Sequence, residues 1–106
     1  MLCTLTARRL KPGAYDAFRA AWDPGDAAAE VIERWRPIYH VRDVSDPDIV
    51  ISFGFFNGSL EELAEVQAQA GRGDQVARIA QNVEEVLLDG AYEVVEKLDS
   101  IASDGR

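Results

Sequence analysis

The stretch from 39 to 63, YHVRDVSDPDIVISFGFFNGSLEEL, constrains the fold more than any other part of this chain. Alternating side chains predict strands over 38–44 and 49–56, and the turn formers of 45–48 join them into a hairpin. The two strands carry different kinds of side chain on their two faces. A sheet of this kind has two surfaces to cover, and one thin layer of helices covers only one. We therefore expect a partner on the other surface.

The same patterns predict the remaining elements. Alternation indicates a first strand over 2–9, and an apolar stripe indicates a helix from Ala14 to about Asp23. Ser59 followed by Glu62 forms a capping box that begins a helix lasting to about Ala70. We further expect three elements: a short helix over 27–35, a helix capped by Asp74 whose buried stripe runs to Leu87 before the stop at 89–90, and a last strand over 91–98.

This order of elements is typical of the ferredoxin-like α+β sandwich, βαββαβ, with a four-stranded antiparallel sheet and helices on one face. The chain has room for a single domain, expected over 1–98, with a flexible tail over 99–106. We expect the more apolar hairpin face to lie under the helices, namely Ile49, Ile51, Phe53 and Phe55. The uncovered face would then carry Leu2, Thr4, Thr6, Val50, Ser52, Gly54 and Phe56. Because that surface is still apolar, we expect a homodimer that buries it.

Composition excludes several partners. The 106 residues carry a net charge of −8, which repels nucleic acid, and no apolar run is long enough to span a membrane. The arginines, Arg8 and Arg9 among them, are scattered and are expected on solvated faces. The lone Cys3 cannot form an internal disulfide, and no metal-ligand spacing is present, so a cytoplasmic protein without a metal is expected.

The chain resembles the dimeric α/β-barrel superfamily, which includes the antibiotic biosynthesis monooxygenase-like proteins. The resemblance covers roughly 1–98 and is carried by LKPGAYDAF, by YHVRD followed by DPDIVISFGFF, and by GSLEEL. It implies a dimeric barrel whose ligand lies between sheet and helices or at the open end of the barrel. The family includes oxygenases, isomerases, dechlorinating and haem-active enzymes and members without a known role, and a cofactor-independent monooxygenase-like reaction is the one we expect here. The first strand, LCTLTAR, lacks the asparagine of the haem-degrading members, and Phe55 and Phe56 stand where tryptophan is common, which disfavours haem degradation.

Five residues are candidates for a site in such a barrel. His40 is the only histidine and could act as a general base, although a lone strand histidine is more often structural. Tyr39 and Tyr92 could orient a polar ligand, and Trp35 could form an apolar wall. Ser52, beside the low bulk of Gly54, is a further ligand contact. Trp22 lies in a helical stripe, where a core position is expected.

Two functions stay open at this point. The first is a small enzyme, or a binder of a compact apolar or aromatic molecule, with a closed cavity into which His40 points. The second is a non-catalytic dimeric module that acts through protein contacts, with His40 in solvent and no cavity of a few hundred Å³. No phosphate-binding glycine loop, paired cysteines or Ser-His-acid order supports a kinase, metalloenzyme or hydrolase.

Overall fold

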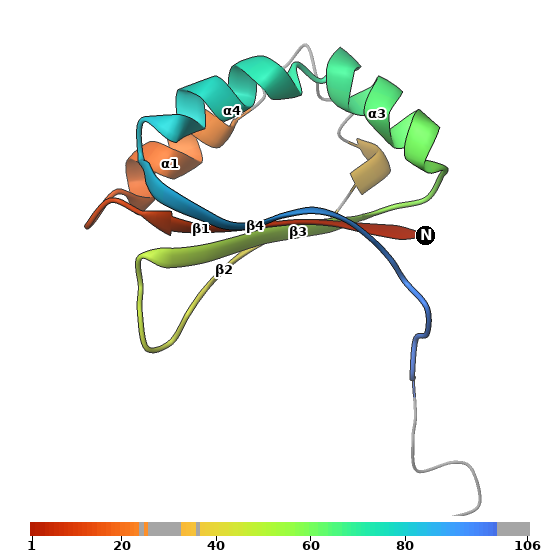
Figure 1. Ribbon diagram of the computed structural model, residues 1–106, viewed down its shortest axis with the longest axis horizontal. Coiled ribbons are helices and arrows are strands. Elements are labelled where there is room, and N and C mark those ends of the chain that lie inside the picture. The colour runs from red at the N-terminus through yellow and green to blue at the C-terminus, as the bar shows by residue number, and fades with distance from the viewer. Residues whose placement is uncertain (24, 26–32, 36, 100–106) are drawn as a thin grey trace, which may run out of the picture.

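A computed structural model describes residues 1–23, 25, 33–35 and 37–99 (Figure 1). Its strands are β1 (Leu2–Leu10), β2 (Ile38–Arg42), β3 (Ile49–Phe56) and β4 (Val83–Glu93). Its helices are α1 (Tyr15–Trp22), the single 3₁₀ turn η2 (Glu33–Trp35), α3 (Leu60–Gln69) and α4 (Arg72–Ala80). The strands form one sheet in the order β2-β3-β1-β4, and every neighbouring pair is antiparallel. This is the predicted ferredoxin-like α+β architecture.

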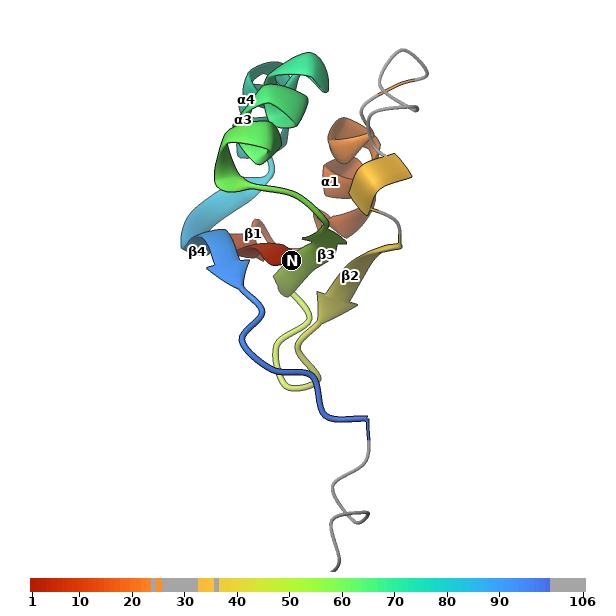
Figure 2. The same ribbon diagram turned by 90° about the vertical axis from the view of Figure 1, so that its right-hand side faces the viewer.

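The helices all lie on one side of the sheet (Figures 1 and 2). α3 and α4 run above β4, while α1 and η2 lie above the β2 and β3 side. The other side of the sheet, which we name the open face, has no helix of the described residues over it. Of the helices that the structure describes, none is long and apolar enough to cross a membrane.

The capping box was predicted correctly, but the end of the last helix was not. The Ser59 side chain accepts a hydrogen bond from the amide of Glu62, whose own side chain bonds back, and α3 begins there as expected. α4 is shorter than predicted, because 83–88 belongs to β4 instead of extending the helix, and Asp74 lies inside the first turn. β4 also begins earlier than the predicted 91–98 and ends at Glu93. Pairing with the whole of β1 decides between helix and strand here.

The predicted assignment of the two sheet faces was wrong. Val50, Ser52, Gly54 and Phe56 are buried beneath the helices, whereas Phe55 is 40% exposed on the open face. The registers place Thr4 beside Gly54 and Thr6 beside Ser52, so these threonines also lie under the helices. The open face instead carries Cys3, Leu5, Ala7, Tyr39, Val41, Ile49, Ile51, Phe53, Phe55, Leu88 and Tyr92. An apolar open face therefore exists, as expected, but it is formed by the alternate set of residues.

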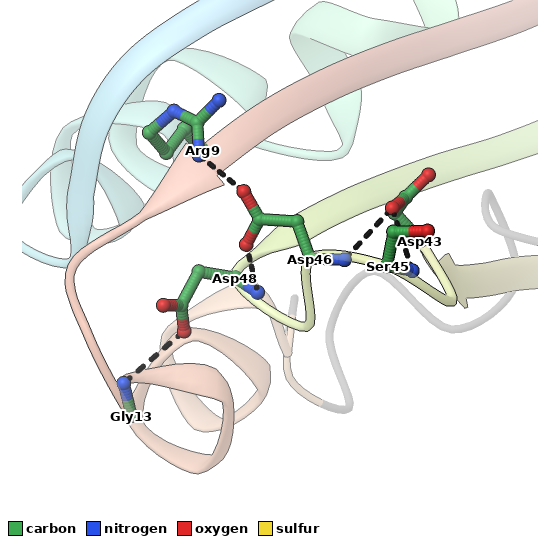
Figure 3. Close-up of polar contacts among 6 residues, drawn as sticks. All are labelled: Arg9, Gly13, Asp43, Ser45, Asp46 and Asp48. Atoms are coloured by element: carbon green, nitrogen blue, oxygen red, sulfur yellow. Dashed lines mark hydrogen bonds and ion pairs between the residues drawn. The ribbon is translucent and has the colours of Figure 1, made fainter.

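The loop between β2 and β3 is held by three aspartates (Figure 3). Asp43 accepts a hydrogen bond from the amide of Asp46 at 2.8 Å, and the Asp46 carboxylate pairs with Arg9 of β1 at 2.6 Å. Asp48 accepts from the amide of Gly13, just before α1. These acids therefore fasten the hairpin to β1 and α1. Among the described residues no three acidic, histidine or cysteine side chains are placed to hold a metal.

Buried apolar side chains form two separate clusters beneath the helices. One lies under α1 and α4 and consists of Leu10, Phe18, Val50 and Ile79. The other lies under η2 and α3 and consists of Trp35, Phe56, Leu63 and Val66. The interior is therefore packed at both ends, and the space between the clusters is the part that bears on function. Two expected segments, most of the helix over 27–35 and the tail beyond 99, lie outside the described residues.

Candidate functional site

A cavity of about 360 Å³ lies between the sheet and the helices. β1, β3 and β4 form its floor, and α3, α4, η2 and the end of α1 form its walls. Aromatic and aliphatic walls surround a few polar groups, a composition typical of sites for small molecules. The polar side chains that line it are Thr4, Thr6, Arg8, Ser52, Gln67, Arg72, Gln75 and Asp89.

Small side chains in the sheet create this space. Gly54, Thr4 and Ala91 stand beside one another across β3, β1 and β4, and Ser52 and Thr6 form the adjacent row. The rows that flank them carry large residues, Phe56 and Leu2 on one side and Val50 and Arg8 on the other. α1 and α4 pack on Val50 of one larger row, and α3 packs on Phe56 of the other. The register of the strands thus brings these small residues side by side and leaves room for the cavity.

Gly54 also positions Trp35 in the wall. A β-carbon at Gly54 would lie 3.1 Å from the carbonyl oxygen of Trp35 and 3.5 Å from its Cδ1, so a larger residue there would push η2 slightly away from β3. Trp35 packs on Phe56 with 5.0 Å between ring centroids. Trp22, at the end of α1, is partly buried. It packs against the first apolar cluster, in line with the expected core position, and also forms part of another wall of the cavity.

A serine–histidine pair joins β3 to β2 at the edge of the cavity. Ser52 is buried and lines the cavity, and its Oγ lies 2.7 Å from Nδ1 of His40. The imidazole is held by two aromatic rings in edge-to-face contact, Trp22 at 4.7 Å and Phe18 at 5.6 Å between centroids. His40 therefore stands behind Ser52, and a ligand in the cavity would meet the serine hydroxyl first.

The surroundings of His40 keep its ring neutral. Burial, and then the positive charges of Arg19 and Arg8, lower its pKa from the ordinary 6.5 to about 4. At neutral pH the ring therefore has one N–H and one free lone pair. It can either accept the Ser52 hydroxyl proton in a hydrogen bond or donate to the serine oxygen. In both cases it fixes the orientation of that hydroxyl.

This lowered pKa predicts a stability change with pH. The folded protein resists protonation of His40 while the unfolded chain does not, so its contribution is complete above pH 6.5 and is lost as the pH falls to about 4. Because the ring is only half-buried, we expect a loss of about 1–2 kcal/mol over this window. Urea unfolding at pH 7 and pH 4.5 should show this loss in the native protein and a smaller one in His40→Gln. Equal losses in both proteins would contradict the assignment.

A second polar group occupies the β1, β4 and α4 side of the cavity. The Asp89 carboxylate oxygen Oδ1 accepts hydrogen bonds from Thr6 at 2.9 Å and from Arg72 at 3.1 Å. Arg8 is only 5% exposed, and its guanidinium lies 5.4 Å above the ring of Phe18. Burial and then the charge of Arg72 lower the pKa of Arg8, and Asp89 opposes them. Asp89 thus interacts with both arginines: it accepts a hydrogen bond from Arg72, and its charge acts on Arg8.

The structure separates the sequence candidates into two groups. Ser52 and Trp35 line the cavity, and His40 is one hydrogen bond behind it. Tyr39 and Tyr92 lie on the open face, where Tyr39 stacks on Phe53. Sequence analysis missed the polar groups of the other strands and of α4, above all Arg8, which was expected in solvent and is buried. The alternation of β1 could have indicated it, because Arg8 shares a face with Thr4 and Thr6.

The protein belongs to the ferredoxin-like α+β class. Its sheet has one open face, and a cavity lies under its helices. Solved structures of the same class match nearly the whole chain. One is a proposed antibiotic biosynthesis monooxygenase from Chloroflexus aurantiacus, with a TM-score of 0.67, 17% identity, and coverage of 91% of this chain and 94% of that one. Another, of the same proposed activity, comes from Nitrosomonas europaea, with a TM-score of 0.66, 14% identity and coverage of 91% and 100%.

The same fold occurs in a protein of another kind. An uncharacterized NIPSNAP domain protein from Burkholderia xenovorans matches with a TM-score of 0.60, 17% identity, and coverage of 94% of this chain and 98% of that one. No protein-family model and no curated protein sequence matches the chain. The chain therefore has the fold of the antibiotic biosynthesis monooxygenase-like proteins, and at these identities the likeness extends to the fold alone.

Proposed function

We propose that this protein binds a compact, largely aromatic molecule in the cavity between its sheet and its helices. The cavity itself supports this function, because about 360 Å³ falls within the usual range for ligand sites. An apolar cavity of about 150 Å³ holds benzene, so this one has room for about two fused rings. Trp22 and Trp35 offer ring surfaces, and Ser52 offers an oriented hydroxyl. The non-catalytic module would require a solid interior, whereas the described residues leave this cavity between sheet and helices.

The open face supports a dimer as the working unit. Its exposed members include Tyr39, Val41, Leu88 and Tyr92, each between 40% and 48% exposed. A contiguous apolar surface of this kind is rarely left in water, and a second copy related by two-fold symmetry would bury the same residues on both chains. The cavity lies on the other side of the sheet, so dimerisation would leave it free.

Thermal unfolding tests the ligand site. A library of phenols, quinones and aromatic acids should contain molecules that raise the melting temperature by on the order of 10 °C when present at about 100 times their dissociation constant. Thr4→Phe should remove this response, because Thr4 is in the middle of the floor and a phenyl ring there would fill the cavity. The unliganded variant should be at least as stable as the native protein, because the ring enters empty space.

Val76→Phe is the matched control, because Val76 is 43% exposed on α4 and does not line the cavity. This variant should keep the response to ligands. A melting temperature that no library member changes, or one that rises equally in Thr4→Phe, would support the non-catalytic module instead.

A cofactor-independent oxygenation is a second candidate, which the Ser52–His40 pair favours. The solved structures whose names give a proposed antibiotic biosynthesis monooxygenase suggest the reaction class, and the Ser52 hydroxyl, oriented by His40, could hold a phenolic hydroxyl by a hydrogen bond. An electron-rich phenol and O₂ would then give a quinone and water: one oxygen atom enters the ring, and the other leaves as water with two hydrogens of the substrate, which supplies the electrons. Oxygen uptake should be lost in Ser52→Ala and reduced in His40→Gln, while binding measured by calorimetry persists. Uptake that is unchanged in Ser52→Ala would exclude this role for the pair.

A further inference from the structure

We propose that the cavity selects ligands with a negatively charged group, an aromatic carboxylate in the first place, and that Arg8 is the residue that binds the charge. This inference rests on the proposed function and names the ligand class for the same cavity. A buried polar atom without a hydrogen-bond partner in the described part of the chain supports it. Nη1 of Arg8 is buried and has no hydrogen-bond partner among the residues that the structure describes.

Such an atom is unusual in a folded protein, because buried N–H groups almost always have an acceptor. Arg8 lines the cavity, and because Nη1 itself is covered, the guanidinium would turn toward the cavity for a ligand to supply the missing acceptor. The guanidinium carbon lies 5.4 Å from the centre of the Phe18 ring, a cation–π contact that helps to hold the side chain beside the cavity. A planar guanidinium and a carboxylate match in geometry, since two N–H groups can bond two oxygens.

The charges around Arg8 also favour an anionic ligand. Among the residues that the structure describes, Asp89 is the only acidic side chain in the cavity lining, and its Oδ1 is already shared by Thr6 and Arg72. Two guanidinium groups and one carboxylate leave one positive charge in excess at this side of the cavity. The chain as a whole carries −8, so this local excess is opposite in sign to the rest of the protein. An anionic ligand would balance this excess positive charge.

The opposite side of the cavity is suited to the ring of the same ligand. Trp35, Leu63 and Gly54 form the wall and floor near η2 and α3. A molecule with an aromatic body and one carboxylate would therefore place its ring toward these residues and its charge toward Arg8. Simple inorganic anions would lack the apolar contacts and should bind weakly.

The test compares 2-naphthoate with 2-naphthamide by calorimetry at pH 7, since the two differ in charge and hardly in shape. The native protein should bind the acid about 30-fold more tightly than the amide, as expected for a charge-assisted hydrogen bond. Raising the salt concentration from 20 to 500 mM should weaken binding of the acid and leave the amide unchanged. Arg8→Met should abolish the preference and retain affinity for the amide, and Arg8→Lys should restore part of the preference.

Arg72→Met is the second variant. It removes the neighbouring charge, and it should lower the preference less than Arg8→Met does. The inference is overturned if the native protein binds both ligands equally, or if Arg8→Met keeps the preference for the acid. Binding of the amide without binding of the acid would refute the inference and leave the proposed function standing. If neither ligand binds, the inference is refuted, and the melting-temperature library decides on the proposed function. Should Arg8→Met fail to fold, the comparison of acid with amide and its salt dependence in the native protein still decides.

Discussion

Ile51→Lys is expected to convert the proposed dimer into single chains. Ile51 lies on the open face in the middle of the sheet, beside Ala7 of β1 and Val41 of β2. In a dimer that pairs the open faces each lysine would be buried among apolar side chains, without a compensating acid. We expect the dissociation constant to rise by about 100-fold or more, which is about 2.7 kcal/mol. Sedimentation at micromolar concentration should give twice the 11.7 kDa chain mass for the native protein and 11.7 kDa for the variant.

Two further variants separate loss of the dimer from loss of the fold. Leu88→Lys changes a side chain that is 48% exposed on β4, so the single chain should tolerate it while the dimer is weakened. Val76→Lys places the same charge on the outer surface of α4 and should leave the dimer unchanged. Circular dichroism should be native-like in all three. A native protein that sediments as one chain, or an Ile51→Lys variant that remains a dimer, would contradict the pairing of open faces.

Phe18→Ala is expected to cause the largest loss of monomer stability. Phe18 has no exposed surface and packs in the cluster formed with Leu10, Val50 and Ile79. Deleting a buried phenyl ring costs about 3–5 kcal/mol through lost burial and the void that remains. The change also reaches the site, because the ring of Phe18 supports both His40 and Arg8.

Urea unfolding at one fixed protein concentration measures this effect, since the stability of a dimer depends on concentration. Phe18→Leu keeps most of the packing and should lose about 1.5 kcal/mol at most. Val76→Ala, on the outside of α4, should change stability by about 0.5 kcal/mol or less. A Phe18→Ala variant as stable as Val76→Ala would mean that the first apolar cluster is not packed as described.

The elements whose signals are local could be predicted from the sequence. The capping box of Ser59 and Glu62 fixes the start of α3 within the segment itself. The segment 83–88 could not be assigned in this way, because Val83, Val86 and Leu87 fit a helical stripe as well as a strand. Only the pairing of this segment with β1, which lies far away in the sequence, selects the strand. Contacts of this kind leave no mark in a short window of residues.

The sheet faces and the site show the same limit. Both faces of β3 are apolar, and the helices cover the one that contains Ser52 and Gly54, although it is the less apolar of the two. This choice makes sense if each face is buried by a different partner, the helices on one side and a second chain on the other. With the faces exchanged, Tyr39 and Tyr92 moved out of the proposed site and Arg8 moved in.

The central claim is that a ligand binds under the helices, and amide and indole NMR signals test it most directly. Both tryptophans of the chain line the cavity, so their indole N–H signals report on its two walls. Titration with 2-naphthol should shift these two signals and the amides of Ser52 and Gly54, saturate together, and leave Tyr39 and Phe55 of the open face unmoved. If no concentration of this ligand or of any melting-temperature hit shifts the cavity signals, or if only the open face responds, the account is wrong.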